Sequence, residues 1–190
     1  GIESDRLDAQ FDLAAAALIG GLTHSATIAS GVGNPYFSVK FTGLGIDIGK
    51  HSIGHGGSFK DMSPGQLKVK IHKFHFQLMA DLMKKLEAVP EGDGTMLDNT
   101  VIVYLSDAAE AHHSRCGQWP FVLIPGKNTG LQGGRYLDFP HYMQDGHREI
   151  GNLYTTLLHA AGEKREYFGV RDAMLKGAAR GDGPLEALLS

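Results

Sequence analysis

The segment from Met96 to Gly126 constrains the fold more than any other part of the chain. It contains two short apolar runs, Thr100–Leu105 and Phe121–Ile124, and each ends at turn-forming residues. Runs of this length that are rich in β-branched and aromatic residues are typical of buried strands. Because helical patterns precede and follow them, the sequence predicts an α/β layout.

The clearest helical pattern runs from Ser63 to Ala88. Ser63 can cap the helix, Pro64 fits its first turn, and Gln66 completes a pattern that resembles a capping box. The apolar residues expected to form the buried stripe of this helix are Leu67, Ile71, Phe74, Leu78, Leu82 and Leu86.

The other segments give weaker patterns. A first helix is expected up to Gly20-Gly21, and a further helix is expected over Ile150–Ala161. Ala26–Ala29 suggests a short strand. The glycine-rich region 31–57 has no periodicity and predicts a loop, either active-site-like or simply irregular. The region 127–145 is expected to be a loop with a hairpin-like pattern.

Length and composition exclude several classes of protein. At 190 residues, a single domain over 1–190 is expected. The net charge is −3 and no basic block stands out, which argues against a nucleic-acid partner. No apolar run has the length of a membrane-spanning helix, and no signal peptide is evident. Cys116 is the only cysteine, so no internal disulfide is possible.

The first predicted strand ends in Ser106-Asp107, and the pair His112-His113 lies in the polar loop that follows. In open α/β sheets, ligands bind beyond the carboxyl ends of the strands. Carboxylate and imidazole are also suitable ligands for a divalent metal. Asp107 is therefore a candidate ligand or catalytic group, or else a solvated residue at the sheet edge. Of the two adjacent histidines, His113 is the candidate ligand.

The other histidines leave alternatives open. His51 and His55 have the spacing i, i+4, and the glycines around them favour a loop over a helix. They are either two metal ligands or hydrogen-bonding groups of a polar loop. His72 and His75 lie beside the apolar stripe of the long helix, where a solvated face is the expected environment.

The order and spacing of these segments resemble the alkaline phosphatase and sulfatase superfamily. The segment 94–107 is similar to a core strand of that superfamily, Trp119–Gly126 to the strand that follows it, and Ile150–Gly162 to the last helix. Gly134–Pro140 and Phe168-Gly169 resemble a secreted bacterial branch of the superfamily, which is a domain-of-unknown-function family. The resemblance covers most of the chain.

This resemblance implies a three-layer α/β sandwich with a mainly parallel sheet, of which the chain would be the C-terminal part. It also implies a divalent metal, zinc or calcium, with His51, His55, Asp107 and His113 as ligands. Asp107 is followed by Ala108 where the superfamily has Asp-His, so one ligand is missing. The superfamily nucleophile lies in the N-terminal half, which this sequence does not match. Localisation would be secreted or periplasmic.

Two functions follow as hypotheses. The first is a metal-dependent hydrolase of phosphate or sulfate esters, acting on a small-molecule ester in its full-length form. The second is a non-catalytic relative that binds a ligand or partner on the same fold. A half-domain would expose apolar surface and a sheet edge, so the chain is expected to self-associate or to pair with a missing N-terminal half.

Overall fold

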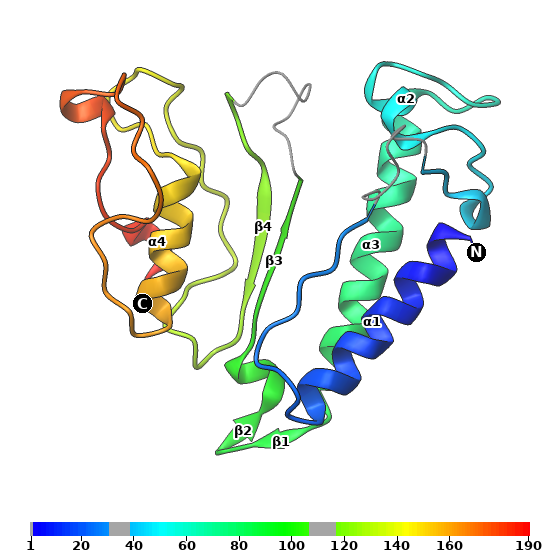
Figure 1. Cartoon of the computed structure of the whole chain (residues 1–190), viewed down its shortest axis with the longest axis horizontal. Coiled ribbons are helices and arrows are strands. Elements are labelled where there is room, and N and C mark those ends of the chain that lie inside the picture. The colour runs from blue at the N-terminus through cyan, green and yellow to red at the C-terminus, as the bar shows by residue number, and fades with distance from the viewer. Residues whose placement is uncertain (1, 31–38, 107–116) are drawn as a thin grey trace. The chain divides into compact units, whose positions relative to one another are not determined.

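The computed structural model describes residues 2–30, 39–106 and 117–190, and the chain divides into two compact units, Gly1–Met96 and Leu97–Ser190 (Figure 1). The first unit contains α1 (Glu3–Ile19), η1 (Thr42–Leu44), α2 (Lys50–Gly54), α3 (Pro64–Glu87), β1 (Pro90–Glu91) and β2 (Gly94–Thr95). η2 (Met96–Asn99) spans the boundary, and β3 (Val101–Leu105), β4 (Phe121–Pro125), α4 (Ile150–Ala160), η3 (Gly177–Ala179) and η4 (Glu186–Leu188) follow. Each unit has its own apolar core, and the single domain over 1–190 stays a prediction.

The long helix α3 confirms the pattern seen in the sequence. Ser63 is its N-cap: the Ser63 hydroxyl accepts from the backbone N–H of Gln66, and the Gln66 side chain accepts from the backbone N–H of Ser63. This capping box satisfies two backbone donors that the first helical turn cannot satisfy. Most of the predicted stripe is buried, with Leu67 and Leu86 completely inaccessible.

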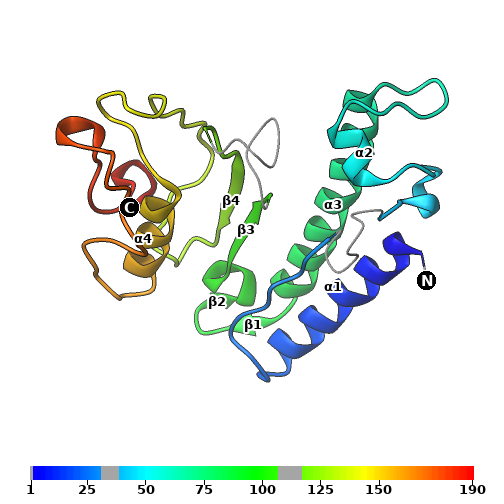
Figure 2. The same cartoon turned by 45° about the horizontal axis from the view of Figure 1, so that its top comes forward.

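α3 lies beside α1 and the segment that carries η1 and α2 (Figure 2). Its apolar stripe packs against them within this unit. α1 agrees with the predicted first helix, and Leu7 is its most deeply buried apolar residue. Helix therefore packs on helix here, rather than on the sheet of the three-layer sandwich that the resemblance implies. The buried residues of this core are Leu7, Phe41, Ile46, Ile53, Leu67, Ile71 and Leu78.

Two weaker predictions for this unit are also wrong. Ala26–Ala29 forms no strand. The described part of the region 31–57 is not an irregular loop throughout, because it includes η1 and the short helix α2. Ile53 of α2 is only 1% exposed, so tertiary burial stabilises a turn of helix in a sequence without helical periodicity.

Both predicted strands exist, but they pair in the opposite sense from the one expected. β3 and β4 are antiparallel, with Val103 opposite Leu123, and β1 and β2 form a second antiparallel pair. Among the described residues these two small sheets are the only ones, so the three-layer α/β sandwich with a mainly parallel sheet is contradicted. Short apolar runs bounded by turns occur in both kinds of sheet, and they carry no information on strand direction.

In the second unit, β3 and β4 pack one face against α4, which confirms the helix expected over Ile150–Ala161 (Figure 1). Three polar residues of α4 are completely buried, and each binds backbone. The Asn152 amide donates to the carbonyls of Gly181 and Gly183, while the hydroxyls of Thr155 and Thr156 accept from backbone N–H groups further along the chain. The C-terminal segment, which has little regular structure, thereby finds partners for its buried backbone groups.

Candidate functional site

His51 and His55 lie close together at the exposed surface of the first unit. Their ring centroids are 4.5 Å apart, with the rings edge to face. His51 belongs to α2, and the backbone N–H of His55 donates to the carbonyl of His51 at 3.1 Å. The prediction of a loop is therefore wrong for His51, whereas His55 lies in the turn just beyond the helix. The helical turn between them brings both rings to the same side of the chain.

The flanking glycines explain why the sequence favoured a loop. Gly49 is the N-cap of α2 in an extended conformation, and Gly56, just beyond the helix, has a φ of 90°. That φ lies in the region that glycine adopts without steric cost and that ends many helices. These two glycines mark the ends of the helix, and only Gly54 lies within it.

The other two predicted metal ligands, Asp107 and His113, lie outside the described residues. The convergence of His51, His55 and Asp107 thus stays a prediction. Within the ranges 2–30, 39–106 and 117–190, no group of three or more histidine, cysteine, aspartate or glutamate side chains is arranged to hold a metal ion. The described part of the candidate centre is the pair His51 and His55.

His75 departs from the solvated face expected for it. It is 6% exposed on the buried side of α3, and its Nε2 lies 3.3 Å from the hydroxyl oxygen of Ser30. Burial, with the nearby Lys50 and His72, lowers the pKa of His75 from 6.5 to about 4, although Glu3 acts in the opposite direction. His75 is therefore neutral at neutral pH. Its position one helical turn from both Ile71 and Leu78 is the sequence signal that places it on the buried stripe.

His72 does lie on the exposed side of α3, as the sequence predicts. Its ring centroid is 6.2 Å from that of His75. Partial burial lowers the pKa of His72, and the ammonium groups of Lys50 and Lys68 lower it further. Lys50 immediately precedes His51, and its ammonium group donates to the carbonyl of Ser30 at 3.5 Å.

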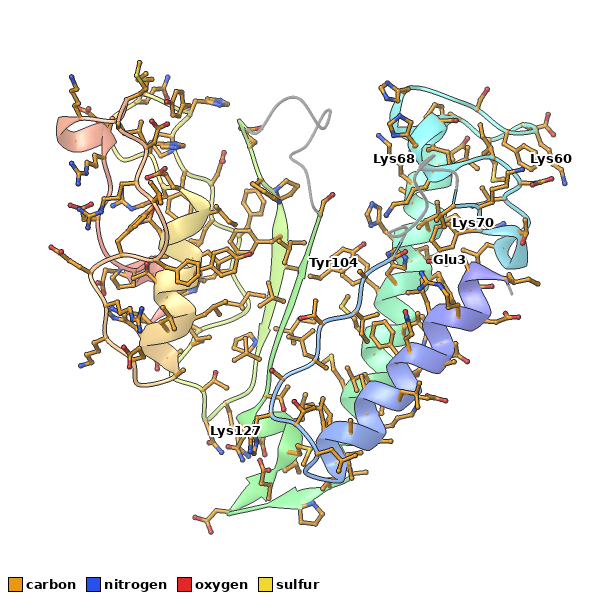
Figure 3. All side chains as sticks on the ribbon, viewed as in Figure 1. Glu3, Lys60, Lys68, Lys70, Tyr104 and Lys127 are labelled. Atoms are coloured by element: carbon orange, nitrogen blue, oxygen red, sulfur yellow. The ribbon has the colours of Figure 1, made fainter. Side chains whose placement is uncertain are left out.

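Positive charge therefore gathers around the N-terminal half of α3 and α2. Figure 3 shows Lys68 and Lys70 on this part of α3, with Glu3 at the start of α1. Glu3 forms an ion pair with Arg6 at 2.6 Å. Lysine side chains attract anions, so an anionic ligand is the electrostatic complement of this part of the surface.

The second unit contains a groove of about 640 Å³. β4 lines one side of it through Phe121 and Leu123, and the segment Gln132–Pro140 lines another. Its volume falls in the range of about 300–1,000 Å³ that is usual for ligand sites. Sequence reasoning used Gly134–Pro140 only for the family resemblance and did not place these residues in a site.

Within the groove, His147 is 8% exposed and its Nδ1 donates to the carbonyl of Pro140 at 2.9 Å. The ring is thereby held with Nε2 as the nitrogen able to accept a further hydrogen bond. Trp119 also lines the groove, and its indole N–H donates to the carbonyl of Ser106 at 2.8 Å.

Comparison with known proteins gives no relative: no family model, no curated protein and no solved structure matches this chain. Among the described residues, no helix is both long and apolar enough to cross a membrane.

Proposed function

We propose that this chain supplies two imidazole ligands, His51 and His55, to the metal centre of a hydrolase that acts on phosphate or sulfate esters in its full-length form. The observation that supports this proposal is the 4.5 Å separation of the two rings on one face of α2. Two histidines one helical turn apart are a recurring zinc-binding arrangement, since their ring nitrogens can converge on one ion.

The donor set favours zinc over calcium. Zinc is bound well by neutral imidazole, whereas calcium takes oxygen ligands. Asp107 and His113 are the proposed further ligands. When bound, a divalent ion would polarise the ester oxygen and stabilise developing negative charge. The ammonium of Lys50, one residue before His51, would add to the attraction for an anionic ester.

Zinc titration of the purified chain by calorimetry tests the proposed ligands. Loss of a side chain that only supports a metal ligand usually weakens metal binding about 10–100-fold. His51→Ala and His55→Ala each remove a proposed ligand itself, so each should weaken zinc binding by at least this factor. His24 is exposed in the same unit, and His24→Ala is the matched control that should bind zinc like the parent. Equal zinc affinity in all four proteins would refute the assignment.

The alternative function is that of a non-catalytic relative that binds a ligand or partner. It is favoured by the sequence Asp107-Ala108, which lacks the histidine of the superfamily pattern. For the chain alone, we expect little or no metal-dependent hydrolysis of p-nitrophenyl phosphate or p-nitrophenyl sulfate, since loss of a nucleophile usually costs several orders of magnitude in rate. Robust turnover that His55→Ala abolishes would contradict this expectation and place the complete chemistry within this chain.

Secretion and association with another polypeptide stay predictions. Association is tested by light scattering of the purified chain over a range of concentrations. A strictly monomeric species at high concentration would contradict it.

A further inference from the structure

The outer edge of β4 carries backbone groups that point away from β3. The backbone N–H of Gly126 donates to the carbonyl of Thr100 at 2.8 Å, and Val101 is paired with Pro125. Hydrogen-bonded pairs alternate along an antiparallel ladder, so Ile124 and Val122 bond to β3. The N–H and C=O groups of Phe121 and Leu123 therefore face outward, and they have no hydrogen-bond partner in the described part of the chain.

The segment that could have paired with this edge is bonded elsewhere. Leu131 forms an isolated antiparallel bridge with Leu189, and the backbone N–H of Gln132 donates to the carbonyl of Leu188 at 2.8 Å. Near the end of β4 the same segment comes close, because a Cβ at Gly133 would lie 3.2 Å from the Pro125 side chain. The groove is bounded by β4 on one side and by this segment on the other.

The groove also offers side chains that suit a peptide with a carboxylate. The guanidinium of Arg135 donates to the carbonyl of Ala187 at 2.6 Å and to the amide oxygen of Gln132, which are neutral acceptors. Arg135 thus keeps a charge that no described carboxylate neutralises in an ion pair. Tyr136 beside it is 91% exposed and offers an aromatic surface to a ligand in the groove.

The groove has three other charged side chains. Arg148 also donates to neutral acceptors, the carbonyls of Gly146 and His147, but it is half-buried whereas Arg135 is exposed. Glu149 accepts from the Tyr167 hydroxyl at 3.0 Å and caps α4. Asp138 also lines the groove. The two arginines and two carboxylates together give the groove a net formal charge near zero. A ligand with one carboxylate, rather than several, is therefore expected to match it.

We propose that this groove binds an extended peptide segment, which adds to β4 as a third strand and places one acidic side chain against Arg135. The peptide would exchange backbone hydrogen bonds with Phe121 and Leu123. Strand addition of this kind gains affinity from the main chain and specificity from side-chain pockets. It would also cover an edge that an isolated two-stranded sheet leaves open, an arrangement of low intrinsic stability.

The test uses the whole chain and the blocked peptide acetyl-Val-Thr-Val-Asp-Val-amide, followed by NMR. In the free protein, the amide hydrogens of Phe121 and Leu123 should exchange faster than those of Val122 and Ile124, which serve as internal controls. Bound peptide should slow exchange at Phe121 and Leu123. A peptide N-methylated at alternate residues should bind weakly or not at all, because its main-chain donors are removed.

The proposed contact between the peptide's Asp and Arg135 is tested by changing each partner in turn. Replacing Asp by Asn in the peptide should weaken binding about tenfold in the parent chain, since a charge-assisted hydrogen bond is lost. In Arg135→Gln, the two peptides should bind equally. Strand addition is overturned if the N-methylated peptide binds as well, if free succinate binds as tightly as the peptide, or if neither peptide affects β4. An unchanged preference for Asp in Arg135→Gln overturns the role of Arg135.

Discussion

Acidification should destabilise the first unit through one histidine. His75 is 6% exposed on α3, where its environment favours the neutral ring over the charged one. Lys50 and His72 disfavour a positive charge on the His75 ring, whereas the carboxylate of Glu3 favours it. The unfolded chain exposes the same ring to water, where protonation is not penalised.

The expected magnitude follows from the difference between the two pKa values. The pKa of His75 falls from 6.5 to about 4 on folding, a difference of about 2.5. At about 1.36 kcal/mol for each unit, this corresponds to about 3 kcal/mol. Because the folded pKa is the lower one, the unfolded chain takes up the proton first as the pH falls. The contribution is therefore present above pH 6.5 and is lost progressively between pH 6.5 and about 4.

Urea unfolding followed by far-UV circular dichroism, which reports mainly on α1 and α3, measures this loss. His75→Gln cannot titrate but can still bond to Ser30. Between pH 6.5 and about 4, the free energy of unfolding of this variant should fall by about 3 kcal/mol less than that of the parent. His24→Gln removes an exposed histidine and should keep the parent's pH dependence. If His75→Gln and the parent lose the same stability on acidification, the ring is not held neutral by its surroundings and the argument fails.

Three further substitutions test contacts within one unit or the other. Each is measured by equilibrium unfolding at neutral pH. Ser63→Ala removes the capping hydroxyl of α3 and should cost about 1 kcal/mol; no loss would show that the capping box contributes nothing. Thr156→Val leaves the buried N–H of Leu185 without its acceptor at 2.7 Å and should cost about 1–3 kcal/mol, whereas a neutral result would mean that water replaces the hydroxyl. Gly151→Ala brings a Cβ into the Tyr167 hydroxyl and should cost about 1–3 kcal/mol; a more stable protein would show that the tyrosine moves aside freely.

The candidate site was predicted only in part. The sequence identified His51 and His55 as a pair by their spacing, and the structure brings their rings together. It could not predict the helical turn that does so, because burial of Ile53 rather than local propensity stabilises that turn. Asp107 and His113, outside the described residues, stay predictions. The groove beside β4 has no sequence signature, because residues from 117 to 188 line it.

The sequence by itself determined the elements whose stabilising contacts are local. The capping box at Ser63 and the apolar stripe define α3, and the short apolar runs define β3 and β4, since these patterns involve neighbours a few residues apart. Only the tertiary structure decided that β4 runs antiparallel to β3 and that His75 faces the core rather than solvent. Strand direction and burial depend on partners distant in the chain, and a single strand or helix carries the same residues whichever partner it meets.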